Sequence, residues 1–448
     1  MNPPNIILVV LDTLGKNTLY SQVDQTVAFR KLVEDGVVYK NAIAPSSWTV
    51  PSHGSMFTGL YPSEHGVIQK EKNEDLSVVL QRSFDIYDPL SQILRGNGYS
   101  TLSFSANLLV SSGTGFEKGF DICEPSDVSK RLEITNREFH ELIKFGREGV
   151  LANAMDFFKD GNISNLTKLI KLNADLRKYL KELKYPANKD ASGVIRKFTQ
   201  SNKREPFFAF LNFMEAHEPY KKVPIIPINY QEREARKYSL DWFNLKKIRK
   251  RQIEYFRAKY RESVHTIDEE LSKLLKYLNE NSLYDNTMII ITSDHGQAFG
   301  ENRFIGHGHF LFDELIQIPL LIKYPNSHKY MVSEGYQTLV DIFEFLKSWG
   351  NNMQYAFPSR ELVFSEVRGM KFPETTPKKY WDQNDNEDRR ALFKDRMKIV
   401  VNGTRGVVEE FTINGLSSEV GKHKDDARKL IEELEIFVGS NKFNMPVI

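Results

Sequence analysis

The stretch NIILVVLD, residues 5–12, decides the fold of this 448-residue chain. Six consecutive apolar residues precede Asp12, and four of them are β-branched. A continuous apolar run, rather than an alternating one, is typical of a strand that is buried on both faces of a parallel sheet. Four more runs of this kind occur, at residues 99–106, 206–214, 287–294 and 319–324.

Amphipathic helical patterns separate several of these runs, and residues 262–281 are an example. The alternation predicts an α/β fold in which helices sandwich a large, mostly parallel sheet. We expect this domain over residues 1–335, with charged helical insertions at about 125–203 and 221–258. Residues 336–448 instead show short strands and one helix, which predicts a smaller C-terminal antiparallel α+β lobe.

The charge balance and the cysteine content narrow the class of protein. The 61 basic and 59 acidic residues leave a net charge of +2, so no nucleic-acid or anionic-membrane partner is expected. The single cysteine, Cys123, allows no intramolecular disulfide and fits a reducing compartment. The N-terminal apolar run is too short for a signal peptide or a membrane span. We therefore expect a cytoplasmic protein without a transmembrane segment.

Acidic residues follow two of the predicted strands. Asp12 ends the first run, and Asp294 ends the run at 287–294 and is followed by His295. In an open parallel sheet, ligands bind beyond the carboxyl ends of the strands. Two carboxylates and an imidazole there would suit Mn²⁺, Zn²⁺ or Mg²⁺. The competing interpretation is that an aspartate at such a position only caps a helix.

Residues 44–67, APSSWTVPSHGSMFTGLYPSEHGV, are predicted to bring the hydroxyl group of Thr49 near these acids. Pro51 fits the first position of a helix, so Thr49 would lie at the helix entrance. Free N–H groups there favour an anion, and a hydroxyl beside a divalent cation can act as a nucleophile. Alternatively, Thr49 only caps the helix. His65, at the far end of the segment, is expected to be structural.

Histidines and an asparagine follow the other predicted strands. His217 comes just after the run at 206–214, and His307 and His309 lie in a glycine-flanked loop. Such histidines can protonate a leaving group, clamp the transferred group or bind a second metal, although each taken alone is about as often structural. Asn107 follows the run at 99–106 and is predicted to line the substrate pocket.

These segments, in this order, resemble the sulfatase family of the alkaline phosphatase superfamily. The resemblance implies an alkaline phosphatase/sulfatase-like fold over nearly the whole chain apart from the two insertions. It is carried by PNIILVVLDTLG (4–15), SSWTVPSHGSMFTGLYPSEHGV (46–67), FSANLLVSSGTGFEKGFD (104–121), FFAFLNFMEAHEPY (207–220), TMIIITSDHG (287–296) and GHGHFLFDELIQIPLLIKYP (306–325).

The departures from the family pattern bear on the chemistry. In sulfatases the nucleophile segment reads Cys-x-Pro-x-Arg or Ser-x-Pro-x-Arg, and its first residue is oxidised to formylglycine. Thr49 stands at that position here, and oxidation of a threonine would give a ketone instead. Threonine is the residue that the phosphodiesterase and phosphoglycerol-transferase branches use. Thr13 replaces an aspartate common at the family's calcium site, His53 replaces the arginine, and His307 replaces a lysine.

The sequence and the resemblance together predict a metal-dependent hydrolase or transferase of phosphate or phosphonate esters. Thr49 would form a covalent intermediate with a small-molecule, glycan-linked or lipid-linked anionic ester. One divalent ion (Mn, Zn, Mg or Ca, with Mn or Zn favoured) is expected, and a second is possible. The alternatives are a sulfate-ester hydrolase that uses Thr49 without formylglycine, and a catalytically silent binding protein on this scaffold. The predicted metal ligands are Asp12, Thr49, Asp294 and His295, the further catalytic residues are His217, His307 and His309, and the substrate-binding residues are His53 and Asn107.

Overall fold

The computed structural model describes residues 3–68, 79–125, 190–218, 250–368, 387–439 and 443–446. Most of the two predicted insertions, residues 126–189 and 219–249, lies outside these ranges. No helix in the described part of the chain is both long enough and apolar enough to cross a membrane.

The described residues form a central sheet of nine strands, and the prediction of a large, mostly parallel sheet is confirmed. The run at 319–324 forms a strand that is antiparallel to both of its neighbours. The order across the sheet is β11 (Met331–Thr338), β2 (Val37–Ile43), β10 (Leu320–Lys323), β6 (Thr287–Thr292), β1 (Asn5–Leu11), β5 (Phe207–Phe213), β3 (Ser100–Ser105) and β4 (Ile122–Pro125), with β9 (Gln317–Ile318) paired to β2.

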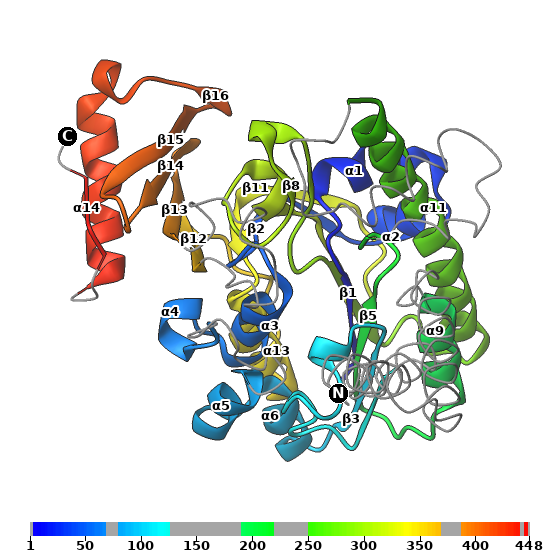
Figure 1. The fold of residues 1–448 in the computed structure, drawn as a ribbon. Helices are drawn as coiled ribbons and strands as arrows, with labels where there is room; N and C mark the ends of the chain where they lie inside the picture. The colour runs from blue at the N-terminus through cyan, green and yellow to red at the C-terminus, as the bar shows by residue number, and fades with distance from the viewer. Residues whose placement is uncertain are drawn as a thin grey trace, which may run out of the picture.

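Strand β1 is buried on both faces, because its side chains alternate between two hydrophobic cores. The even-numbered residues from Ile6 to Val10 face one helical layer, and the odd-numbered residues from Ile7 to Leu11 face the other. Figure 1 shows helices on both sides of the sheet. The first layer contains α3 (Thr49–Thr58), α5 (Val79–Ile86), α6 (Leu90–Gly96) and α13 (Asp341–Gly350), and the second contains α1 (Lys16–Tyr20), α2 (Ala28–Glu34), α9 (Ala191–Gln200) and α11 (Lys250–Glu280).

A second, antiparallel sheet follows, as predicted for the C-terminal lobe, and α14 (Lys424–Val438) covers it. Figure 1 shows this lobe in orange and red beside the main domain. The predicted boundary at 335/336 falls inside β11, so the main sheet extends further than expected, and the second sheet begins only at Leu362. Its strands are β12 (Leu362–Arg368), β13 (Asp388–Lys394), β14 (Met397–Asn402), β15 (Val407–Ile413) and β16 (Leu416–Ser417).

Two described helices contain residues that were assigned to the insertions. Helix α9 lies within 125–203 and packs against β5 and α11 in the second helical layer. The first turns of α11 lie within 221–258. The smaller elements are α4 (Pro62–His65), α12 (Asp313–Ile316), the hairpin of β7 (Ala298–Phe299) and β8 (Ile305–Gly306), and the 3-10 turns Val23–Gln25, Leu108–Val110, Glu301–Arg303 and Val420–Lys422.

Candidate active site

Four neighbouring parallel strands bring polar side chains to one edge of the main sheet. The strands lie in the order β6, β1, β5, β3. Because all four run in the same direction, their carboxyl ends meet there. The residues that follow these strands are, in the same order, Asp294 with His295, then Asp12, then His217 and finally Asn107.

Asp12, Asp294 and His295 form a buried group whose possible ligand atoms all lie within 4.8 Å of one another. Oδ1 of Asp294 accepts hydrogen bonds from the backbone N–H of Thr13 (3.1 Å) and of His295 (2.9 Å). Oδ1 of Asp12 and Oδ2 of Asp294 have no hydrogen-bond partner among the described residues. Buried carboxylate oxygens without donors are costly unless a cation neutralises them, so this donor set fits a divalent ion.

The two carboxylates differ in their pKa values. Burial, together with the nearby charge of Asp294, raises the pKa of Asp12 to about 7. Burial acts in the same direction on Asp294, but the imidazoles of His295 and His53 outweigh it and lower the pKa of Asp294. Without an ion, the site therefore holds a proton on Asp12 near neutral pH, at the position where a metal would bring positive charge.

Thr13 holds a backbone conformation that β-branched residues rarely adopt, with φ of 64°. Its hydroxyl donates to the carbonyl oxygen of Asp12 (2.7 Å), and its own carbonyl accepts a hydrogen bond from the Tyr260 hydroxyl (2.7 Å). These bonds hold the turn that directs the Thr13 N–H at Asp294. Thr13 thus contributes its backbone N–H to the site, whereas its hydroxyl is hydrogen-bonded to the carbonyl oxygen of Asp12.

Thr49 lies directly beside this group. Its Oγ1 is 3.3 Å from Nε2 of His295. Nδ1 of His295 donates to the Gly296 carbonyl (2.9 Å), so Nε2 is the ring nitrogen that faces the Thr49 hydroxyl. Helix α3 begins at Thr49, two residues before the predicted start at Pro51. A proline is tolerated at the third helical position because the N–H groups of the first turn have no partner within the helix.

His53 lies one helical turn after Thr49 and is completely buried. Its Nδ1 donates to the Thr49 carbonyl (2.9 Å) and is 3.8 Å from Oδ2 of Asp294. The rings of Phe116 and Phe210 contact it edge to face, and burial lowers its pKa. A substrate contact at His53, as predicted, would have to use Nε2, which has no partner among the described residues.

The loop that carries His307 and His309 depends on two glycines, Gly306 and Gly308, whose φ values are 112° and 94°. His307 is close to two other imidazoles: its ring centroid is 4.5 Å from that of His295 and 5.2 Å from that of His217. The structure therefore brings these three predicted histidines together.

Burial and the neighbouring imidazoles lower the pKa of His307 well below its usual range. Burial also opposes the charged form of His217, but the carboxylates of Glu218 and Asp12 outweigh it and raise the pKa of His217.

His309 is buried and engages the C-terminal lobe. Its carbonyl oxygen accepts a hydrogen bond from Nη1 of Arg389 (3.1 Å), and its ring contacts Phe304 edge to face. His65 is also buried: its Nε2 donates to the Ser55 hydroxyl (3.0 Å), its Nδ1 accepts from the backbone of Val67 (3.0 Å), and burial lowers its pKa to about 3. His65 is therefore neutral and stabilises the turn after α3.

Comparison with known families identifies the scaffold. The profile of the sulfatase family matches residues 4–351, which is more than half of the chain. The chain belongs to the sulfatase family.

Relatives of this sulfatase-family chain are named for different activities. It is 32% identical over 115 residues to the multifunctional alkaline phosphatase superfamily protein PehA of Trinickia caryophylli, covering 25% of this chain and 22% of PehA. It is 23% identical over 340 residues to the ulvan-active sulfatase of Formosa agariphila, covering 73% of this chain and 57% of that protein. The matches thus span little more than half, or less, of these relatives.

Solved structures show the same fold. The phosphonate monoester hydrolase of Agrobacterium radiobacter superposes with a TM-score of 0.62 at 17% identity, covering 97% of this chain and 95% of that one. A 2-O GAG sulfatase gives a TM-score of 0.64 at 13% identity, covering 97% and 92%.

Asn107 in this sulfatase-family site uses both polar atoms of its side chain within the protein. Its Nδ2 donates to Oδ2 of Asp12 (2.7 Å), and its Oδ1 accepts from the backbone N–H of Leu109 (2.9 Å). Asn107 therefore orients the carboxylate of Asp12, and its predicted contact with substrate stays a prediction.

Two residues of the site were not predicted from the sequence. Glu218 joins His217 and His307 in a second group of possible metal ligands within 4.8 Å of one another. Gln297 accepts a hydrogen bond through Oε1 from Nδ1 of His307 (2.7 Å). Glu218 directly follows His217, and Gln297 lies two positions after His295. This closeness in sequence was the only available signal.

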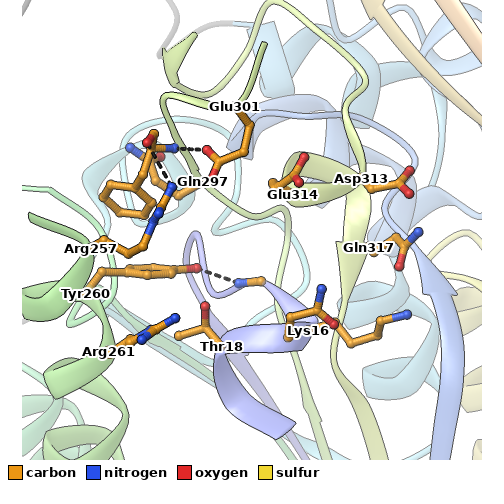
Figure 2. Close-up of a pocket in the computed structure, with 13 residues that line it drawn as sticks. Lys16, Thr18, Arg257, Tyr260, Arg261, Gln297, Glu301, Asp313, Glu314 and Gln317 are labelled. Carbon is orange, nitrogen blue, oxygen red and sulfur yellow. Dashed lines mark hydrogen bonds and ion pairs between the residues drawn. The ribbon is translucent and has the colours of Figure 1, made fainter. Parts of the chain in front are cut away.

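A cavity of about 290 Å³ lies next to Gln297 (Figure 2). The Tyr260 hydroxyl on one wall accepts a hydrogen bond from the backbone N–H of Gly15 (2.7 Å). The cavity has no net preference for an anion, because its three basic and three acidic side chains balance. These are Lys16, Arg257 and Arg261 against Glu301, Asp313 and Glu314.

Proposed function

We propose that this sulfatase-family chain is a metal-dependent hydrolase or transferase of phosphate or phosphonate esters that acts through a covalent intermediate on Thr49. One observation carries the proposal: the Thr49 hydroxyl lies 3.3 Å from Nε2 of His295, at the first position of α3. Beside it are two buried carboxylates, of Asp12 and Asp294, that each keep one oxygen without a hydrogen-bond partner in the described part of the chain.

Asp12, Asp294, His295 and the Thr49 hydroxyl would hold one divalent cation, and this oxygen-rich set with one imidazole favours Mn²⁺ or Zn²⁺. When bound, such a cation lowers the pKa of an adjacent hydroxyl and neutralises charge on the ester. Asn107 and the N–H of Thr13 orient the two carboxylates, so that their unpartnered oxygens remain available.

The reaction proceeds in two displacements. In the first, Oγ1 of Thr49 attacks phosphorus while the bond to the leaving oxygen breaks, and the hydroxyl proton ends on that oxygen. In the second, water or an acceptor alcohol attacks the phosphothreonine, the Oγ1–phosphorus bond breaks, and the proton of the attacking group returns to Thr49. The N-terminus of α3 favours the negative charge of the transferred group. His217 and His307 would lie on the leaving-group side.

A second candidate is hydrolysis of sulfate esters by the same threonine, without formylglycine. The family match and the likeness to sulfatases favour it. The nucleophile and the donor set described above would serve a sulfuryl group equally, because it presents the same tetrahedral arrangement of oxygens.

The test is a paired assay of p-nitrophenyl phosphate, bis-p-nitrophenyl phosphate, a phenylphosphonate ester and p-nitrophenyl sulfate at several metal concentrations. Acid quenching and peptide mass spectrometry should locate a phosphoryl group on Thr49. We expect Thr49→Ala to lower turnover by about 10⁴-fold or more, and Thr58→Ala in the same helix to change it little.

Other outcomes would point elsewhere. Sulfate turnover as fast as that of every phosphorus ester would favour the second candidate. If Thr49→Ala left both ion affinity and turnover unchanged, the chain would be a binding protein on this scaffold.

A further inference from the structure

We infer that His217, Glu218 and His307 form a second divalent-cation site next to the first one. Their possible ligand atoms lie within 4.8 Å of one another. Two imidazoles and one glutamate are a ligand set that suits Zn²⁺ and leaves a further position open for water or substrate. The inference rests on the proposed function in one respect only, which is that both ions act on the same ester.

The hydrogen bonds of the two imidazoles leave the same nitrogen available in each. Nδ1 of His217 lies 2.7 Å from the backbone oxygen of Glu218, which can only accept, so Nδ1 carries the proton. Nδ1 of His307 donates in the same way to Oε1 of Gln297 (2.7 Å). Nε2 is then the nitrogen in each ring that can offer its lone pair to a cation. Metal-binding histidines typically have this arrangement, in which the second nitrogen donates to an oxygen that fixes the ring.

Glu218 adds a negative charge to these lone pairs. Its Oε2 is buried and has no hydrogen-bond partner within the described ranges. The side chain as a whole is 19% exposed, and Oε2 is 3.8 Å from Nδ1 of His217. A buried carboxylate oxygen without a donor is costly. Two imidazoles and a carboxylate whose buried oxygen has no hydrogen-bond partner among the described residues therefore lie close enough to share one cation.

The position of this group explains why a second cation would be useful. The ring of His307 contacts both the His295 ring and the His217 ring, so the two ligand groups adjoin each other. An anionic ester bound at Thr49 would otherwise meet the lone pair of His307, which repels it. A cation on this side would supply the positive charge that the leaving oxygen needs.

Metal stoichiometry tests the inference without relying on turnover. The protein is stripped with a chelator, reloaded with Zn²⁺, desalted, and measured by inductively coupled plasma mass spectrometry. We expect two ions per chain in the wild type, and one in Glu218→Gln and in His307→Gln. Glu218 is partly exposed, so its amide variant should fold normally. Its melting temperature in chelator checks this.

Two further variants separate this site from the first one. Asp294→Asn should lose the first ion and keep the second, and His265→Gln, at an exposed position on α11, should keep both. If the wild type binds one ion, which Asp294→Asn removes and Glu218→Gln does not, the second site is refuted and the first stands. If the single ion is lost in Glu218→Gln but kept in Asp294→Asn, the second site stands and the first is refuted. A wild type that binds no ion would overturn both.

Discussion

The guanidinium of Arg389 donates to the main-chain oxygen of His309 through Nη1, at 3.1 Å. Arg389 lies on β13 of the C-terminal sheet and is buried, and its Cζ lies 4.5 Å from the centre of the Phe310 ring. Glu387 and Glu409 accept hydrogen bonds from the same guanidinium. One side chain therefore fixes the histidine loop of the main domain to the second sheet.

Replacing Arg389 by methionine should destabilise the protein by about 3–5 kcal/mol, because it removes the buried guanidinium that pairs with Glu387 and Glu409. Arg405→Met is the matched control. Arg405 pairs with the same two glutamates, but 47% of its side chain is exposed, so its loss should cost about 0–1 kcal/mol. Urea unfolding measures both. At a temperature where each variant is folded, only Arg389→Met should lower kcat. Equal losses of stability in the two variants would show that the contact with His309 is unimportant.

Asn107→Ala should weaken binding of the first ion by about 10–100-fold, because it removes the donor that orients Asp12. Isothermal titration with Zn²⁺ or Mn²⁺ measures this change, and Asn281→Ala, at an exposed position just after α11, should leave the affinity unchanged. At saturating ion, KM should change little. A raised KM with unchanged ion affinity would instead support the substrate-binding role predicted from the sequence.

The affinity for the first ion should depend on pH. Because the pKa of Asp12 is raised to about 7 in the ion-free site, the ion must displace a proton below that pH. The dissociation constant should therefore rise by about tenfold for each pH unit below 7 and level off above about pH 8. Asp294 has a lowered pKa and stays ionised over this range. Titrations between pH 5.5 and 8.5 test this, and a constant affinity from pH 5.5 to 7 would contradict it.

Asp12→Asn should stabilise the ion-free protein at pH 8. A raised pKa means that the folded state resists ionisation of Asp12, so the ion-free wild type loses stability as the pH rises towards and through 7. The amide avoids this cost and should gain about 1–4 kcal/mol. Thermal melting in chelator measures the difference.

Added ion should shift the difference in stability towards the wild type. At a concentration of 100 times Kd, it should stabilise the wild type by about 2.7 kcal/mol and leave Asp12→Asn unchanged. A variant that is less stable than the wild type in chelator would show that Asp12 is not under electrostatic strain.

The sequence was sufficient to predict the strands and therefore the edge where the site lies. Continuous apolar runs identify buried parallel strands, and residues that follow such strands meet in space. Asp12, Asp294, His295 and His217 were all placed by this reasoning, without knowledge of their contacts.

The partners of these side chains could not be predicted in the same way. The bond from Asn107 to Asp12 joins residues 95 positions apart, and the bond from Arg389 to His309 joins residues 80 apart. Such contacts depend on the packing of whole elements. The turn at Thr13 was hidden as well, because its φ of 64° is one that threonine rarely adopts and that only the surrounding hydrogen bonds sustain.

The regular spacing of the central strands has a consequence for protein engineering. Neighbouring strands are separated by roughly 4.8 Å, a distance set by main-chain hydrogen bonds rather than by any side chain. The residues that follow β6, β1, β5 and β3 are therefore held at a fixed spacing along the edge of the sheet. Exchanging one residue at a strand end can alter the chemistry at that position while the residues at the other strand ends keep their positions. Libraries that vary these few positions should thus yield folded proteins with new reactivity more often than libraries that vary the strands themselves.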